Sequence, residues 1–344
     1  MKRIHVNMMS SADKVAGQGV GGAYLELMNL LKTRAQKELK ITKTLRAKNP
    51  DITHFHTIDP HFFAMANFKK ITGRRIGYVH LIPDTLDGSL EMPKIAEKIV
   101  KKYLVKFYDK MDHLVVVNPD FKKELVKIGI AREKITYIPN FVAKDKWSPL
   151  PESEKSKFRN TKGWKKDDFV ILGVGQVQKR KGIDDFVKLA EANPNLKFVW
   201  AGGFSFGKMT SGYEKYKAII ENPPKNLQFL GIVDRDEMRK LYASVDLFLL
   251  PSYAELFPMS ILEAASCGAP VMLRDLDLYK NILEGKYLAG KDFDEMNKIL
   301  QNFAQNPKLQ AEMRAKSAEI SEYYSEDRLL KIWIDFYREQ AKNK

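Results

Sequence analysis

Short apolar strands alternate with helices twice along this chain, and this alternation restricts the fold more than any other feature. In the first run, buried strands are expected at residues 3–9, 52–56, 75–80 and 113–117, with one more near Ile135. A helix that starts at Lys94 separates the third of these strands from the fourth. Parallel strands need long crossover connections, which are usually helices, so the pattern predicts a parallel α/β sheet.

The same alternation returns in the second half of the chain. Strands are expected at residues 169–174, 197–201, 227–230 and 247–250, and helices at 183–191, at 236–244 and after Pro258. The stretch 144–166 between the two runs is polar and contains Pro149 and Pro151, which predicts a linker. A chain of 344 residues can bury two cores. We therefore expect domains at residues 1–145 and 146–321, followed by an amphipathic helix at about 322–344.

Charge is distributed unevenly between the two halves. Residues 1–150 hold 27 Lys and Arg against 15 Asp and Glu, net +12, whereas the remaining 31 against 28 give only +3 of the total +15. This asymmetry predicts that the N-terminal half meets a polyanionic surface, either nucleic acid or anionic lipid. The single cysteine, Cys267, and the lack of any long apolar run favour a cytoplasmic protein.

The most informative motif directly follows the strand expected at 247–250. Glu255 lies in the loop, Pro258 suits a helix start, and Glu263 falls one to two turns into that helix. Free amides from Met259 and Ser260 onward can bind a diphosphate, and a carboxylate in a cleft can accept hydrogen bonds from sugar hydroxyls.

This passage resembles the E-x7-E motif of the retaining glycosyltransferases of sequence family 4, and the match continues through Cys267-Gly268 to Pro270-Val271. The resemblance implies the GT-B fold, in which two Rossmann-like domains face each other across a cleft and the C-terminal helix returns to the N-terminal domain. It also implies that Glu255 contacts the donor hexose, that Glu263 contacts the ribose, and that Phe257, Met259 and Ser260 lie at the donor.

A second motif follows the first strand of the second domain. Gly175 opens a turn that leads to Gln176, Arg180 and Lys181, and such a cationic turn suits a diphosphate leaving group. Lys181 matches the lysine of the family. The family usually has arginine where this chain has Gln176, so Arg180 is expected to compensate or Gln176 to mark a subfamily.

In the first domain, Gly21 and Gly22 correspond to the glycines that let the family's backbone approach the donor phosphates. His80 ends a strand at the place where the family has a histidine near the reacting sugar. The resemblance therefore gives His80, Glu255 and Lys181 the catalytic roles, through positioning and electrostatic stabilisation of the departing diphosphate.

No metal site is expected. His54, His56 and His61 lie close in sequence, but no carboxylates are spaced to complete a zinc site. The D-x-D sequence at Asp234 is better explained by helix capping. The donor is a UDP-hexose by resemblance, no tightly bound cofactor is expected, and Mg²⁺ is expected at most to stimulate.

Basic residues of the N-terminal half predict a membrane-binding surface. At helical spacing, Ile95, Ile99 and Tyr103 fall on one side of the helix from Lys94, and its first four lysines fall on the other, which is the pattern of an interfacial helix or of an ordinary core-facing one. The membrane-binding candidates are Lys69, Lys70, Arg74, Arg75, Lys94, Lys98, Lys101 and Lys102.

The stretches 77–85, 111–119 and 138–142 resemble Gram-positive synthases that add α-linked glucose or galactose to diacylglycerol or glucosyl-diacylglycerol. This implies a peripheral enzyme on the inner face of the cell membrane. A glycosyltransferase of cell-surface polysaccharide or teichoic acid is the alternative. A dinucleotide-dependent oxidoreductase stays open because Gly17, Gly19 and Gly22 have G-x-G-x-x-G spacing. A nucleic-acid binder is disfavoured because no aromatic residues interleave the basic patch.

Overall fold

The computed structural model describes residues 2–12, 19–82, 93–204, 207 and 210–343, and these form two compact units. Unit 1 extends to Phe141 and also contains the C-terminal segment from Tyr324; unit 2 is Val142–Tyr323.

Unit 1 is built on a six-stranded sheet in the order β2-β1-β3-β4-β5-β6, with every pair parallel. Its strands are β1 Ile4–Met9, β2 Leu39–Thr42, β3 Ile52–Phe55, β4 Arg74–Val79, β5 His113–Val116 and β6 Ile135–Tyr137. Five of these were expected within a residue or two. β2 was missed because it has only four residues and only Leu39 is fully buried.

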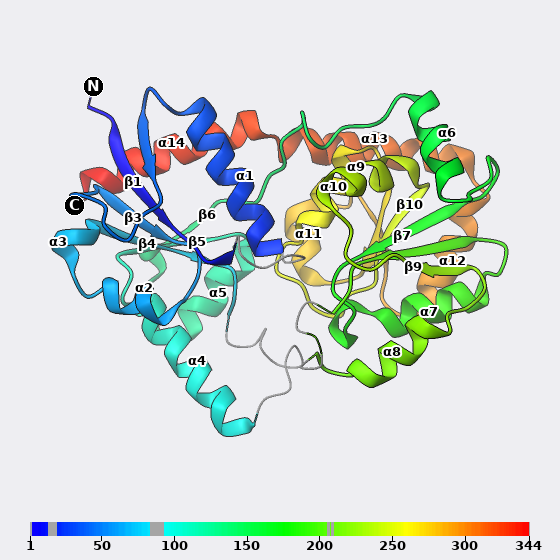
Figure 1. Ribbon diagram of the computed structural model, residues 1–344, viewed down its shortest axis with the longest axis horizontal. Coiled ribbons are helices and arrows are strands. Elements are labelled where there is room, and N and C mark those ends of the chain that lie inside the picture. The colour runs from blue at the N-terminus through cyan, green and yellow to red at the C-terminus, as the bar shows by residue number, and fades with distance from the viewer. Residues whose placement is uncertain (1, 13–18, 83–92, 205–206, 208–209, 344) are drawn as a thin grey trace. The chain divides into compact units, whose positions relative to one another are not determined.

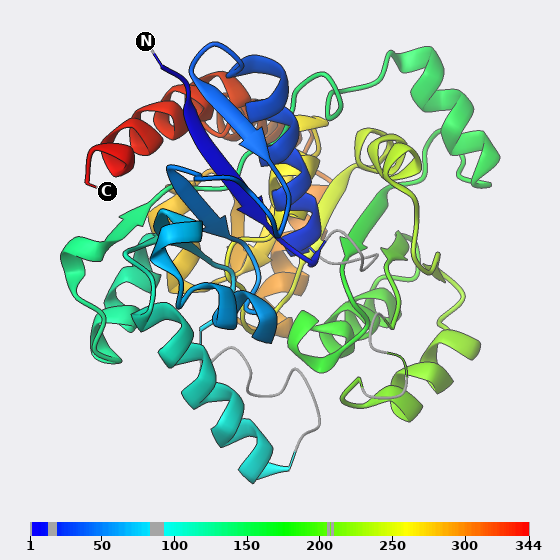
Figure 2. The same ribbon diagram turned by 60° about the vertical axis from the view of Figure 1, so that its left-hand side comes forward.

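Helices cover both faces of this sheet (Figure 1). The helices of unit 1 are α1 Gly19–Arg34, α2 Pro60–Met65, α3 Lys69–Thr72, α4 Lys94–Asp109, α5 Pro119–Lys127 and α14 Glu326–Lys342. Helices α1 and α14 lie side by side on one face, while α2, α4 and α5 cover the other, and the turned view in Figure 2 shows α14, in red, beside β1 and α1.

The C-terminal helix α14 packs on unit 1, as expected. Trp333 and Tyr337 are fully buried, and the Tyr337 hydroxyl hydrogen-bonds Nδ1 of His54 at 2.8 Å. Arg34 of α1 pairs with Glu326 at 2.9 Å and with Asp327 at 2.6 Å. The apolar stripe of this helix thus completes the core of the N-terminal sheet although it is the last element of the chain.

Unit 2 repeats the architecture with the strand order β12-β11-β10-β7-β8-β9, again all parallel. Its strands are β7 Val170–Val174, β8 Lys197–Ala201, β9 Leu227–Phe229, β10 Leu247–Leu250, β11 Val271–Arg274 and β12 Leu288–Gly290. Counted from β7, this is the order 3-2-1-4-5-6 of the doubly wound dinucleotide-binding fold. Unit 2 is therefore Rossmann-like, and unit 1, with the order 2-1-3-4-5-6, has the related flavodoxin-like arrangement of a doubly wound sheet.

The sheet of unit 2 is also covered on both faces. Its helices are α7 Ile183–Ala192, α8 Tyr213–Glu221, α9 Arg235–Ser244, α10 Met259–Ser266, α11 Asp277–Leu283, α12 Phe293–Ala304 and α13 Pro307–Tyr323. Contacts join α10 to α13 on one face and α7 to α12 on the other. The core between them contains Phe186, Trp200 and Leu249, each completely buried.

One sequence-based expectation is wrong in part. The stretch 144–166 was expected to be a linker, yet it contains the helix α6, Glu152–Thr161, which packs on α9. A buried polar residue anchors this helix: Arg159 donates to the Ser244 carbonyl at 2.9 Å and pairs with Asp246 at 3.2 Å. The polar composition concealed the helix because its anchor is an arginine and not an apolar stripe.

Candidate active site

Strand order places a candidate ligand site at the carboxyl ends of β7 and β10. β7 pairs with β8 on one side and with β10 on the other, so the order of strands reverses there. Ligands of open α/β sheets bind at such a switch point, outside the carboxyl ends of the strands. The loops after β7 and β10 are the two segments that the sequence singled out.

The loop after β7 is held by its neighbours. Nε1 of Trp200 donates to the Gly175 carbonyl at 3.0 Å, and the Gly175 amide donates to Ala201. Gly202 has a φ of 138°, and a Cβ there would lie 1.9 Å from the Gly175 oxygen. Only glycine therefore permits the loop after β8 to approach Gly175 this closely.

Direct contacts join the loop after β7 to the loop after β10. Gly182, with a φ of 73°, lies so close to Pro251 that a Cβ would meet its carbonyl oxygen at 2.1 Å. The Tyr253 amide donates to the Arg180 carbonyl at 2.8 Å, and the Arg180 guanidinium donates to the Ala254 carbonyl at 2.7 Å. These contacts bring the cations of one loop to the carboxylate of the other.

Lys181, Arg180 and Glu255 form one charged cluster. Nζ of Lys181 lies 2.5 Å from Oε1 of Glu255, and the Arg180 guanidinium lies 3.5 Å from Oε2. The Glu255 side chain is only 6% exposed and that of Lys181 only 12%. Burial alone would raise the pKa of Glu255, but the positive charges of Lys181 and Arg180 hold it below its ordinary value.

Burial lowers the pKa of Lys181, and the negative charge of Glu255 opposes this shift. Lys181 and Glu255 therefore form a close ion pair that is almost shielded from water. Electrostatic interactions are strong in such an environment. A new anion near Lys181 would interact strongly with it for the same reason.

Glu263 lies in α10, the helix that follows the loop of Glu255. Its Oε2 accepts a hydrogen bond from the Tyr242 hydroxyl of α9 at 2.9 Å. The helix begins at Met259, and Pro258 is the N-cap residue, so Pro258 precedes the first helical position instead of occupying it. Amides at the start of α10 point out of the helix and can bind an anion.

Other expected donor-site residues differ in what they can contribute. Gln176 is half-buried after β7. Ser260 is partly exposed in the first turn of α10. The side chains of Phe257 and Met259 are buried, at 3% and 5% exposure, so these residues can offer a ligand only their backbone.

In unit 1, Gly21 and Gly22 lie within α1, which starts at Gly19, and not in a loop before it. Both glycines therefore belong to the first turns of this helix. Gly17, part of the G-x-G-x-x-G spacing, lies outside the described residues.

His80 follows β4 directly and belongs to a buried histidine cluster. The His80 ring lies 6.0 Å from that of His56, which lies 4.2 Å from that of His54. Burial lowers the pKa of His80 to about 3 and that of His54 likewise to about 3. The imidazoles are therefore neutral, which suits His80 for hydrogen bonding to a sugar and not for carrying charge.

Both arginines among the membrane-binding candidates have partners within unit 1. Arg75, 13% exposed, holds Asp112 through two hydrogen bonds of 2.9 and 2.7 Å. Arg74 donates to Gln340 of α14 at 2.7 Å. Both are committed to contacts within unit 1, so the lysines are the better candidates for membrane contact.

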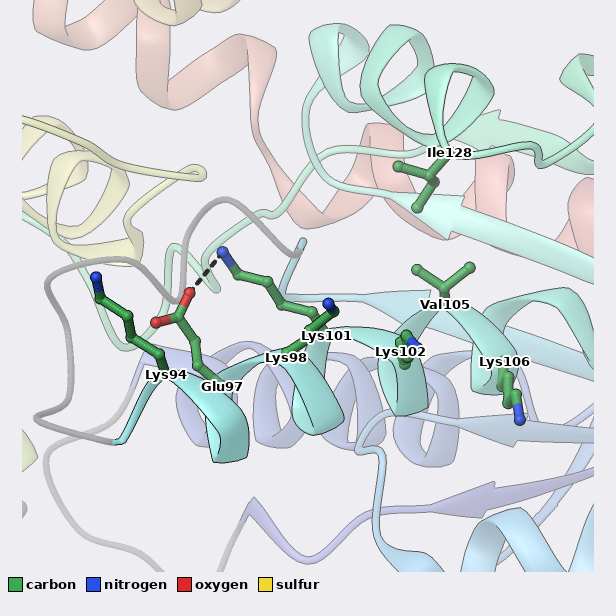
Figure 3. A pocket seen from close by; sticks show the side chains of 8 residues that line it. All are labelled: Lys94, Glu97, Lys98, Lys101, Lys102, Val105, Lys106 and Ile128. Carbon is green, nitrogen blue, oxygen red and sulfur yellow. Dashed lines mark ion pairs between the residues drawn. The ribbon is translucent and has the colours of Figure 1, made fainter.

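The lysines are less firmly held. The exposed ones are Lys69, Lys70, Lys94, Lys98 and Lys102, of which Lys69 lies 3.3 Å from Asp112, while Lys101 pairs with Glu97 at 2.8 Å. Figure 3 shows this pair, with further lysines projecting from α4 along a groove that reaches Ile128. Within the described part of the chain, no three His, Cys, Asp or Glu side chains are placed to hold a metal ion.

Sequence reasoning missed a buried polar group beside the cluster. Arg274, at the end of β11, pairs with Asp185, stacks on the Tyr253 ring at 4.1 Å and donates to the Pro251 carbonyl at 3.1 Å. An arginine that directly follows three apolar strand residues was the available signal. It braces the loop that carries Glu255.

Comparisons with known proteins agree with this geometry. Two family models match: one described as glycosyl transferases group 1 covers residues 154–319, and one described as glycosyltransferase family 4 covers residues 10–146. The chain is 56% identical to alpha-galactosylglucosyldiacylglycerol synthase of Streptococcus pneumoniae, over 99% of this chain and 91% of that protein. The chain belongs to the same glycosyltransferase family as this synthase. The prediction of a family 4 glycosyltransferase is confirmed, and an oxidoreductase is excluded.

Further relatives of the glycosyltransferase extend the comparison. The processive diacylglycerol alpha-glucosyltransferase of Acholeplasma laidlawii is 29% identical over 58% of this chain and 60% of its own length. Among solved structures, sucrose-phosphate synthase from Thermosynechococcus elongatus has a TM-score of 0.80 at 13% identity, covering 99% of this chain and all of that one. Anabaena HepE with UDP and glucose has a TM-score of 0.76 at 16% identity, covering 97% and 99%. The expected GT-B fold is confirmed.

Proposed function

We propose that this glycosyltransferase moves a hexose from a UDP-sugar to a membrane glycolipid and keeps the α-configuration. The observation that carries the proposal is the 56% identity, over nearly the full length of both chains, to a synthase whose name specifies an α-galactosyl group on glucosyl-diacylglycerol. UDP-galactose is therefore the first donor to test and glucosyl-diacylglycerol the first acceptor. UDP-glucose and diacylglycerol are second, on the weaker similarity to the diacylglycerol glucosyltransferase.

The charged cluster suits the donor half of this reaction. Lys181 and Arg180 would bind the diphosphate, whose negative charge grows as the bond to the sugar breaks, with help from amides at the start of α10. Glu255 would accept hydrogen bonds from the hexose and Glu263 from the ribose. Gln176, Ser260 and His80 would supply uncharged hydrogen-bonding groups.

Helix α4 suits the membrane half. Sequence periodicity grouped Ile95 and Ile99 with Tyr103 on one apolar side, and Phe107 continues that side. Phe107 is buried, whereas Ile95 is 77% exposed and Ile99 is 62% exposed. The first half of α4 thus exposes isoleucines as well as lysines, which is the composition of a helix that lies in a lipid interface. Figure 3 shows the lysines.

The lipid would be anionic, because more lysines than acidic residues flank these isoleucines in α4. None of the helices in the described ranges is long and apolar enough to span a bilayer. We infer that the enzyme works as a peripheral protein at the cytoplasmic leaflet.

The decisive experiment is a matrix of donors and acceptors. Purified protein would be incubated with UDP-galactose or UDP-glucose on vesicles that contain diacylglycerol or glucosyl-diacylglycerol, and the products would be identified by mass and by anomeric NMR signals. An α-galactosyl-glucosyl product supports the proposal. Failure on every lipid, with transfer to a polysaccharide or teichoic-acid fragment, would replace it with the polymer alternative.

A further inference from the structure

A buried carboxylate, Asp185, links the two loops of the charged cluster through side chains. Asp185 lies in the first turn of α7, four residues after Lys181, and its side chain is only 10% exposed. Its Oδ2 accepts a hydrogen bond from the Tyr253 hydroxyl at 2.7 Å and a second one from the Arg274 guanidinium. Tyr253 lies two residues before Glu255 in the loop after β10. Asp185 therefore connects the helix that follows one loop to the loop that carries Glu255.

Arg274 completes this connection. Its guanidinium lies 4.1 Å from the centroid of the Tyr253 ring, and its Nε donates to the Pro251 carbonyl at 3.1 Å. The Arg274 side chain is 8% exposed, and a cation buried to this extent needs the counter-charge of Asp185. Asp185 thus holds Tyr253 directly and holds Pro251 through Arg274, so two residues of the Glu255 loop depend on it.

These contacts do not use the ammonium group of Lys181, whereas the closest contact of Glu255 does. A diphosphate carries more negative charge than one carboxylate, so a donor that binds Lys181 competes with Glu255 for it. The loop of Glu255 then needs its other contacts to keep its position. Position matters for catalysis, because a shift of about 1 Å in a reacting or orienting group can lower a rate about 100-fold.

We propose that Asp185 and Tyr253 are positioning residues for Glu255: their hydrogen bond fixes the loop after β10 to α7, so that Glu255 keeps its place at the hexose when the diphosphate engages Lys181. The Tyr253 hydroxyl keeps its proton and so remains a donor, because burial and the hydrogen bond to Asp185 raise its pKa to about 12. This inference rests on the proposed donor roles of Glu255 and Lys181.

The variant that tests this role must spare the fold. Asp185→Asn would leave the buried Arg274 guanidinium without a counter-charge, which destabilises the protein and obscures any effect on turnover. Tyr253→Phe removes only one hydroxyl, from a residue that is 45% exposed. We expect its kcat to fall about tenfold, the effect of losing one hydrogen bond to a charged group. Its UDP affinity, measured by calorimetric titration, should stay within about twofold because Lys181 is untouched.

A double-mutant cycle with Glu255→Gln separates positioning of Glu255 from a general structural role. If Tyr253 acts through the Glu255 carboxylate, adding Tyr253→Phe to Glu255→Gln should lower kcat by less than about twofold further. Losses that multiply in the double variant would show that the hydroxyl acts independently of Glu255 and would overturn the inference. A normal kcat in Tyr253→Phe alone would overturn it as well.

Tyr216→Phe is the matched control, because the Tyr216 hydroxyl donates to Oδ2 of the neighbouring acid Asp184 at 3.0 Å. This contact joins α8 to α7 and holds neither loop of the cluster, so kcat should be unchanged. An equal loss of kcat in Tyr216→Phe would mean that turnover responds to any loosening of α7, which contradicts the inference. A fully active Glu255→Gln protein would instead refute the proposed donor role of Glu255 itself, whatever Tyr253→Phe does.

Discussion

Nζ of Lys181 lies 2.5 Å from Oε1 of Glu255, although the two residues belong to loops 74 positions apart. Neither loop makes the site alone. Gly182 allows the backbone contact between these two loops, and Gly202 lets the loop after β8 approach Gly175. The charged cluster therefore depends on close packing of the strand ends as much as on its charged groups.

The first prediction concerns Glu255. Glu255→Gln keeps the shape but removes the charge that strengthens hydrogen bonds to the hexose, so we expect kcat to fall about 100-fold. Transfer from the UDP-sugar, assayed by product mass, checks this, and cooperative thermal unfolding shows that the variant folds. The exposed residue Glu191 gives the control Glu191→Gln. Near-normal turnover by a folded Glu255→Gln protein would show that the Glu255 carboxylate is not needed for hexose transfer.

The second prediction concerns the diphosphate. Lys181→Ala removes the buried cation of the cluster and should weaken UDP binding about 10- to 100-fold, because charge-assisted hydrogen bonds in a nearly dry site are strong. Calorimetric titration with UDP measures this. Lys179→Ala is the matched control, since Lys179 is two positions away and exposed, and it should bind UDP normally. Equal affinities of the two variants would remove Lys181 from the donor site.

The third prediction concerns the membrane surface of α4. Reversing the charge of the exposed residues Lys94, Lys98 and Lys102 should lower binding to vesicles rich in phosphatidylglycerol at least about tenfold at low salt. Co-sedimentation over a range of salt concentrations measures the effect, which should shrink as salt screens the charges.

Two further proteins complete this test. Reversing the exposed lysines Lys188, Lys298 and Lys308 of unit 2 changes net charge equally and should affect binding less. Ile95→Ser with Ile99→Ser should weaken binding at every salt concentration, since their contribution is hydrophobic. Equal binding by all these proteins would exclude α4 as the docking surface.

The fourth prediction concerns pH and the histidine cluster of unit 1. Burial lowers the pKa of His54 and of His80 to about 3 from the ordinary 6.5. Below pH 6.5 the unfolded chain binds more protons than the folded one, so the free energy of unfolding decreases as pH falls toward 3, by about 1.4 kcal/mol per pH unit for each histidine.

Urea unfolding at pH 7, 6 and 5 measures this slope. His80→Gln should reduce the slope of the free energy of unfolding against pH by the contribution of one bound proton, about 1.4 kcal/mol per pH unit. A free energy of unfolding that stays constant from pH 6.5 to 5 would show that these imidazoles are not buried as neutral groups.

The sequence was sufficient for the fold class and for the two loops that meet in the charged cluster. Alternating short apolar runs predict parallel strands because the pattern is local and each strand is buried on both faces. Glu255 and Lys181 stood out because they lie in loops that follow strands, and Glu263 because it lies in the helix after one of these loops. Parallel strands place such segments at one edge of a sheet. The sequence did not predict the helix α6, because Arg159 anchors it through contacts with Ser244 and Asp246, which lie far along the chain.

Tertiary structure alone decided which charged and apolar groups are free. The sequence indicated that Arg74 and Arg75 were surface cations, but in the structure Arg74 contacts Gln340 and Arg75 contacts Asp112. Ile95 continues the same helical stripe as Phe107, yet it is exposed, because the core of unit 1 ends partway along α4. Periodicity fixes the side of a helix on which a residue lies, but burial and pairing depend on neighbours that are distant in sequence, and only the packed chain brings these together.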